Sequence, residues 1–253
     1  MKEQGVFIFD QERHLVLLLH IKHHEVSYKG LISGKALKRL RRKLMEICER
    51  LHNILLKGKK FYYNSDLDTM PHNGIYILYE KGEREHGSDR IVRIGTHTGE
   101  NLLRSRICEH FFKENKNRSI FRKNIGRAIL NKESNPYLTV WNCDPTTKAN
   151  KEKLKAVIDK DFESKVEKQI SKYIQENFYF KLLAVAGKDN RLELEEKLIG
   201  TVSSCKKCKP STKWFGNYSP IDKIRESGLW QVQGLYSVGL TENDLKTIEK
   251  YIV

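Results

Sequence analysis

Residues 74–79 read Gly-Ile-Tyr-Ile-Leu-Tyr, residues 91–96 read Ile-Val-Arg-Ile-Gly-Thr, and residues 103–110 read Leu-Arg-Ser-Arg-Ile-Cys-Glu-His. The first two stretches are short apolar runs rich in Ile, Val and Tyr, which is typical of strands. We expect the polar residues 80–90 between them to form a loop. The third stretch lies in a segment, residues 102–112, that we predict to be helical. The local order is therefore strand, strand, helix.

The flanking sequence predicts further elements on both sides. Before residue 74, residues 6–9 and 14–21 predict a hairpin, and a long amphipathic helix follows, ending at Gly58. Its apolar positions recur every three or four residues: Leu37, Leu40, Leu44, Ile47, Leu51 and Ile54. After residue 112 we predict a helix over 119–130, a strand over 137–141, a polar helical stretch over 150–176, a strand over 178–186, a helix over 192–202 and a short helix from Thr241.

The positive charge of the chain is concentrated in two places. The net charge is +15, and residues 29–60 carry eleven Lys or Arg against two Glu, while residues 104–132 carry nine against two. Such stretches favour contact with nucleic-acid phosphates, although the solvated faces of two helices would look the same. The residues that we expect to contact DNA are Lys38, Arg39, Arg41, Arg42, Arg104, Arg122, Lys123 and Arg127.

Composition also indicates the compartment. Five cysteines at irregular spacing do not form the framework of a small secreted protein, and no export signal or membrane-spanning apolar run is visible. We therefore expect a cytoplasmic protein without a membrane partner. Cys205 and Cys208 have metal-ligand spacing, but no second cysteine pair or close histidine pair follows them. We interpret this pair as part of a solvated loop.

The motifs quoted above resemble the GIY-YIG nuclease family. Gly74-Ile75-Tyr76 and Arg93-Ile94-Gly95-Thr96 match the two strands of its motif, and Arg106 and His110 match the spacing of the helix that follows. The stretch Leu194-Glu195-Glu196-Lys197-Leu198-Ile199 is similar to its metal-binding glutamate helix, and Asn217, after Pro210, is the candidate for its asparagine. The order of these elements is more specific than any one of them.

The resemblance implies an α/β (α+β) protein whose core is a small antiparallel sheet flanked by helices. It implies that Tyr76 is the base that activates water, that Arg106 contacts the scissile phosphate and that His110 binds the phosphate or assists Tyr76. Glu195 would bind Mg²⁺, or Mn²⁺ in its place. A phenol is a poor base near neutral pH unless nearby positive charge favours its ionised form, and Arg93, Arg106 and the cation would supply that charge.

The chain departs from the family pattern at one position. Arg93 stands where the family has its second tyrosine, and sixteen residues separate it from Tyr76. Either Arg93 replaces that tyrosine by contacting the phosphate, or cleavage is lost and the protein only binds DNA. Both alternatives are open from the sequence.

We predict three parts in the chain. Residues 1–65 form a basic hairpin and helix that contact DNA, residues 66–220 form the nuclease core with a helical insertion at about 145–177, and residues 221–253 pack on that core. A basic region in the same chain resembles the restriction endonucleases of the family, so we expect metal-dependent cutting of double-stranded DNA by a homodimer, at least on DNA. The alternatives are a non-catalytic DNA-binding protein and a structure-specific nuclease of repair or RNA processing.

Overall fold

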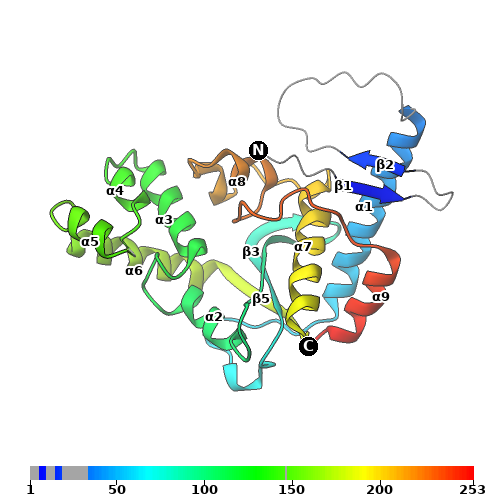
Figure 1. The fold of residues 1–253 in the computed structure, drawn as a ribbon, viewed down its shortest axis with the longest axis horizontal. Coiled ribbons are helices and arrows are strands. Elements are labelled where there is room, and N and C mark those ends of the chain that lie inside the picture. Colours follow the sequence, from blue (N-terminus) through cyan, green and yellow to red (C-terminus); the bar gives the residue numbers. More distant parts are fainter. Residues whose placement is uncertain (1–5, 10–14, 19–33, 146) are drawn as a thin grey trace.

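A computed structural model describes residues 6–9, 15–18, 34–145 and 147–253 of the chain (Figure 1). The predicted N-terminal hairpin is present, because strands β1 (Val6–Phe9) and β2 (Leu15–Leu18) pair antiparallel. The strands of the main sheet are β3 (Ile75–Glu85), β4 (Ser88–Gly95) and β5 (Phe178–Leu183). The helices are α1 (Gly34–Leu56), η1 (Leu67–Thr69), α2 (Leu103–Phe111), α3 (Ile120–Lys132), α4 (Leu138–Asn142), α5 (Lys148–Leu154), α6 (Lys160–Asn177), α7 (Lys188–Ser204), η2 (Phe215–Tyr218), α8 (Asp222–Ser227) and α9 (Glu242–Tyr251).

The main sheet has the order β4-β3-β5 and is antiparallel throughout. Tyr76 pairs with Gly95 and Leu78 with Arg93 on one side of β3, and Tyr76 pairs with Leu182 on the other. This small antiparallel sheet confirms the predicted fold class.

The expected loop over residues 80–90 is wrong. β3 and β4 continue through this segment, and only His86 and Gly87 connect them. Three of its charged side chains, Glu80, Glu83 and Arg90, are buried because hydrogen bonds satisfy them. Arg90 donates to Glu83 at 2.7 and 2.9 Å and to the Gly228 carbonyl at 2.6 Å. Glu80 likewise accepts hydrogen bonds from the indole N–H groups of Trp214 and Trp230, each at 2.8 Å.

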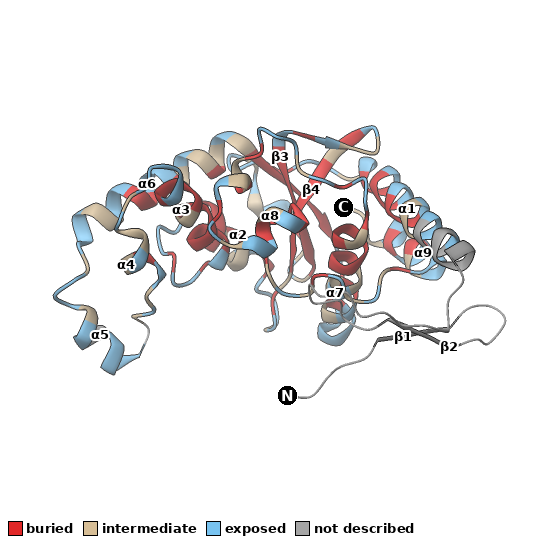
Figure 2. Cartoon of the chain, turned by 90° about the horizontal axis from the view of Figure 1, so that it is seen from above, coloured by how far each residue is buried: buried red, intermediate tan, exposed pale blue. Residues whose placement is uncertain are grey.

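The two faces of the sheet are covered by different helices (Figures 1 and 2). Because side chains alternate along a strand, Ile75 and Ile77 of β3 face α1, α7 and α9, whereas Tyr76 and Leu78 face α2, α3 and α6. Figure 2 shows the strands and the inner faces of these helices as buried. The chain is therefore a three-layered α/β protein with an apolar core on each side of the sheet.

Helix α1 belongs to this core. Its residues Ile47, Cys48 and Leu51 pack with Ile75 and Leu194 in one cluster. The buried ammonium group of Lys181 on β5 donates to the carbonyl of Leu55 near the C-terminus of α1, where unpaired carbonyl groups favour a cation. Residues 64–73 thus do not separate two packing units among the described residues.

The strand predicted over residues 137–141 is also wrong, since α4 occupies this segment. Trp141 is fully buried against α3 and donates its indole N–H to the Lys123 carbonyl at 3.0 Å. Gly126 makes room for the ring, because a Cβ there would lie 2.4 Å from it. Tertiary packing of one tryptophan outweighs the strand preference of the segment.

Segments from the C-terminal part cover both edges of the sheet. The backbone N–H of Trp230 donates to the Val92 carbonyl at 2.7 Å, and Gln231 accepts from the N–H of Ile94 at 2.9 Å, so residues 229–231 lie along β4. At the β5 edge, Ile252 forms a β-bridge with Leu183, and Phe61 forms a β-bridge with Phe180.

No helix in the described part of the chain has the length and apolarity needed to cross a membrane.

Candidate active site

The Tyr76 side chain forms the centre of the candidate site. It is 1% exposed and lies on the face of β3 that is covered by α2 and α3. The ring extends across Gly95 on β4, where an added Cβ would lie 2.1 Å from the Tyr76 hydroxyl oxygen. The glycine in the second strand motif is therefore required by the tyrosine in the first. Gly74 is equally constrained, because a Cβ there would lie 2.3 Å from the Leu183 carbonyl oxygen.

His110 on α2 holds the Tyr76 hydroxyl. Its Nε2 lies 2.8 Å from that oxygen and its Nδ1 lies 2.7 Å from the Ser119 hydroxyl. His110 is fully buried, and burial together with the charges of Arg93, Arg106 and Arg122 holds the pKa of the imidazole well below its usual range. The ring is therefore neutral near pH 7. With Nδ1–H donating to Ser119, Nε2 is free to accept the Tyr76 O–H.

Arg106 lies one helical turn before His110 and also reaches Tyr76. Its guanidinium is within hydrogen-bonding reach of the Tyr76 hydroxyl, and it donates to Glu109 and to the Arg118 carbonyl, each at 2.9 Å. Burial alone would lower the pKa of Arg106, but the Tyr76 oxygen and the Glu109 carboxylate outweigh it and raise the pKa. A quarter of the side chain is exposed, so the guanidinium can also meet a phosphate.

Arg93 faces the same site from β4. It is buried, donates to the Trp230 carbonyl at 2.6 Å and lies 5.5 Å from the centre of the Phe121 ring. Its Nε is buried without a hydrogen-bond partner among the described residues. The positive charge of Arg93 acts on both His110 and Glu195. Arg93 thus supplies charge to the site from the position at which the family has a tyrosine.

Glu195 on α7 reaches the site past the end of β4. Its Oε1 accepts a hydrogen bond from the Thr96 N–H at 3.1 Å. Burial raises the pKa of Glu195, and the charges of Arg93 and Arg106 partly oppose that rise. No ion pair within the described part of the chain neutralises the carboxylate. One partly buried carboxylate fits a hard divalent cation, which takes one or two carboxylates plus phosphate and water oxygens.

His97 fixes the strand ends beneath the site. Its Nδ1 lies 2.7 Å from the Gly99 carbonyl, and its Nε2 accepts the Gly74 N–H at 3.3 Å. These two partners define the neutral tautomer with the proton on Nδ1, and burial lowers the pKa of His97 accordingly. His97 positions the start of β3, and both of its ring nitrogens are used in hydrogen bonds to backbone groups.

Asn217 is held by its own loop. Its amide donates to the carbonyl groups of Ser211 and Thr212 at 2.9 and 3.2 Å, and no hydrogen bond among the described residues joins it to Tyr76 or Glu195. The structure thus brings together Tyr76, Arg93, Arg106, His110 and Glu195. A catalytic role for Asn217 stays a prediction.

The residues predicted to contact DNA fall into three groups. Arg39, Arg42 and Arg104 are exposed, whereas Lys38 and Arg41 have side chains outside the described residues.

The prediction for Arg122 is corrected: this side chain is fully buried, binds Glu167 at 2.7 Å and donates to the His110 carbonyl. Lys123 is 9% exposed and donates to the Asn142 and Cys143 carbonyls, and Arg127 donates to the side chains of Asn124 and Asn142. These three basic residues of α3 therefore bind groups within the protein and stabilise the fold.

Two residues beside the site were not identified from the sequence. Ser119 both caps α3, by accepting the Arg122 N–H at 3.2 Å, and contacts His110. Arg118 is 70% exposed, pairs with Glu109 at 3.1 Å and offers its carbonyl to Arg106. A polar residue before a helix and an arginine in a basic stretch are common, so neither had a distinctive sequence signal.

The comparison with known families agrees with this geometry. The model of a family described as GIY-YIG domain matches residues 35–252, and the chain belongs to this family. The family consists of endonucleases, so the chain is an endonuclease that acts on DNA, and enzymes of this family generally depend on a divalent metal ion. No curated protein and no solved structure matches the chain. The matched range includes α1 and α9, which pack in the core with α7.

Proposed function

We propose that the chain is a Mg²⁺-dependent endonuclease of the restriction type, acting in the cytoplasm on double-stranded DNA as a homodimer, at least on DNA. Mn²⁺ would be an alternative ion. The observation that carries the catalytic part is the hydrogen bond of 2.8 Å between Tyr76 and the neutral His110, with Arg93, Arg106 and Glu195 around it. This is the set of groups that phosphodiester hydrolysis needs: a base, positive charge for the phosphate and a carboxylate for the metal ion.

In the proposed reaction, the water oxygen bonds to phosphorus and one water proton passes to the Tyr76 oxygen. The Tyr76 proton moves toward Nε2 of His110 as this happens, and the bond from phosphorus to the leaving deoxyribose oxygen breaks. The negative charge of bound DNA opposes the arginine charges that hold His110 neutral, which makes this proton movement easier on the substrate than in the free protein. Arg106 would bind the phosphate oxygens that gain negative charge.

Glu195 would hold the cation, whose chemistry is to stabilise negative charge on the phosphate and on the leaving oxygen. The carboxylate is oriented for this by the Thr96 N–H. Burial favours the neutral form of Glu195, whereas a bound cation would favour its ionised form, as Arg93 and Arg106 already do in part.

The restriction-type role is supported by the packing of α1, which would contact DNA, and α7, which carries Glu195, in the same hydrophobic core. α1 carries the exposed Arg39 and Arg42 and shares a hydrophobic cluster with α7, the helix of Glu195. A DNA contact on α1 would therefore be held at a fixed position relative to the metal-binding carboxylate of Glu195. Cutting both strands needs two copies of the site, which supports the homodimer.

The experiment is cleavage of plasmid DNA by the wild type, by Glu195→Gln and by Glu193→Gln, with and without Mg²⁺. We expect discrete fragments that require Mg²⁺, loss of cutting in Glu195→Gln with DNA binding retained, and normal cutting in Glu193→Gln, whose carboxylate is exposed and paired with Lys197. Binding without cutting by the wild type would identify a non-catalytic DNA-binding protein. Nicking confined to junctions or other branched DNA would identify a structure-specific nuclease.

A further inference from the structure

A second set of chemically reactive side chains lies on the opposite face of the sheet from Tyr76. The sulfurs of Cys48 on α1 and of Cys205 and Cys208 after α7 meet the ring of His86, from the turn between β3 and β4. The four ligand atoms all lie within 4.8 Å of one another, and the three cysteines are at most 2% exposed. The interpretation of Cys205 and Cys208 as a solvated loop is therefore wrong.

We propose that Cys48, His86, Cys205 and Cys208 bind one structural zinc ion. In a tetrahedral site with Zn–S of about 2.3 Å and Zn–N of about 2.0–2.1 Å, neighbouring ligand atoms are about 3.5–3.8 Å apart. The Cys48 and Cys208 sulfurs are 3.5 Å apart, and the Cys205 sulfur is 3.4 Å from Nε2 of His86. Three thiolates and one imidazole form a closed ligand set, the type that fixes structure and leaves no position for substrate.

The backbone at His86 supports a ligand role. His86 and Gly87 form a two-residue turn with positive φ at both positions, 50° and 70°. Asn, Asp and Gly are the usual residues of such a turn, and histidine is also enriched at positive φ. This backbone directs the His86 ring to the sulfurs, and its Nδ1 has no hydrogen-bond partner among the described residues. The turn therefore places the ring where its Nε2 can bind zinc together with the three sulfurs.

The second histidine near the sulfurs has a different role. Nδ1 of His52 donates to the Cys48 carbonyl at 2.9 Å, and its Nε2 is 4.0 Å from the Cys208 sulfur. His86 approaches a sulfur more closely, and the two rings pack with centres 4.9 Å apart. We therefore assign His86 as the fourth ligand and His52 as a packing neighbour that limits the ring positions of His86.

This site is separate from the proposed catalytic metal. Cys205 follows Glu195 by ten residues, which is about 15 Å along a helix axis at 1.5 Å per residue. Thiolates favour zinc, whereas Mg²⁺ favours oxygen ligands. The zinc would join α1, the β3–β4 turn and the end of α7, and so fix the helix that carries Arg39 and Arg42 to the sheet.

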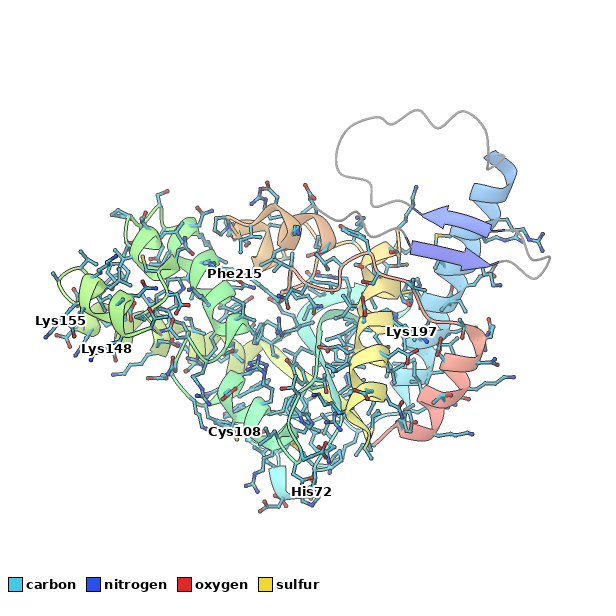
Figure 3. All side chains as sticks on the ribbon, viewed as in Figure 1. His72, Cys108, Lys148, Lys155, Lys197 and Phe215 are labelled. Atoms are coloured by element: carbon cyan, nitrogen blue, oxygen red, sulfur yellow. The ribbon has the colours of Figure 1, made fainter. Side chains whose placement is uncertain are left out.

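The test is metal analysis of the full chain, purified under reducing conditions with Mg²⁺ present throughout. We expect about one zinc ion per chain in the wild type, loss of the ion in Cys208→Ser and in His86→Ala, and retention in His52→Ala. The matched controls are Cys108→Ser and Cys143→Ser, since these are the two free cysteines outside the cluster. Figure 3 labels Cys108, which lies on α2 across the sheet from α7.

Two measurements on the wild type do not depend on how the variants fold. Co²⁺ added after removal of zinc should give the thiolate-to-metal charge-transfer band and the strong visible bands of a tetrahedral sulfur site. A thiol reagent should modify Cys108 and Cys143 in the zinc form and all five cysteines after a zinc-selective chelator. Absence of the cobalt bands or zinc retention by Cys208→Ser would overturn the proposal.

Discussion

The hydroxyl of Tyr76 lies 2.8 Å from Nε2 of His110, and this contact joins the first strand of the sheet core to the helix that follows the second strand. Because Ser119 holds the opposite nitrogen of the ring, the phenol, the imidazole and a serine hydroxyl form one chain of hydrogen-bonding groups on the face of the sheet covered by α2 and α3. The reactive oxygen is thus positioned by hydrogen bonds and by packing over Gly95.

Changing Tyr76 to Phe removes the oxygen and leaves the ring in place. We expect cleavage to fall at least about 100-fold, the lower end of what a positioned acid or base contributes, while DNA binding and thermal stability change little. The matched control is Tyr79→Phe, a buried tyrosine on the same strand that packs on the other face against Tyr179. Cleavage by Tyr76→Phe at the wild-type rate in single-turnover assays would exclude Tyr76 as the base.

Changing Arg93 to Gln should move the acid limb of the pH–rate profile to higher pH. The Arg93 charge lowers the pKa values of both Glu195 and His110, so its removal raises both. More Glu195 is then protonated at a given acidic pH, and cation binding is lost at a higher pH than in the wild type. Single-turnover rates across the acidic range measure this shift. Arg84→Gln, which changes an exposed arginine paired with Asp89, should leave the limb in place.

Changing Arg122 to Ala should destabilise the protein by about 3–5 kcal/mol, because Glu167 is left buried without its partner. Urea unfolding measures the loss, and the double variant Arg122→Met with Glu167→Leu should recover much of it. Arg118→Ala removes an exposed guanidinium and leaves Glu109 paired with Arg106, so it should cost less than about 1 kcal/mol and instead weaken DNA binding. Equal destabilisation by both single variants would contradict this division of roles.

Three buried neutral histidines make stability depend on pH. Burial lowers the folded pKa values of His52, His97 and His110, so the unfolded chain binds protons near pH 6.5 that the folded chain does not bind. Their contribution is complete above that pH and falls as the pH drops through it, by up to about 1.4 kcal/mol per pH unit for each histidine. Denaturant unfolding between pH 8 and pH 5 tests this. His97→Gln should flatten the slope, and His72→Gln, an exposed change, should not.

The order of the site residues was predictable from sequence because they sit in local motifs on regular elements. Tyr76 lies on a strand, and Arg106 and His110 lie one turn apart on a helix that follows shortly after it, so their spacing in the sequence predicts that they lie close together. The missed features depend on partners far along the chain. Glu80 and Arg90 look like loop residues until Trp214, Trp230 and Gly228 supply their hydrogen bonds from more than 130 residues away.

The cysteine cluster was missed for the same reason. Its ligands come from three segments separated by 38 and 119 residues, and only the spacing of Cys205 and Cys208 is visible locally. Arg122 was misassigned because a basic stretch does not show which of its residues meets a buried carboxylate. Charge patterns predict the overall attraction to DNA, but not which arginine is free to provide it.

The covered sheet edges have a consequence for how the protein is made. Tyr76, His110 and Glu195 all leave the ribosome before residues 229–231 and 252 are available to close the sides of β4 and β5. Until then the nascent chain exposes unpaired strand edges, which invite association with other chains. Completion of the sheet, and with it a fully supported DNA-cutting site, therefore waits until these later residues have been made.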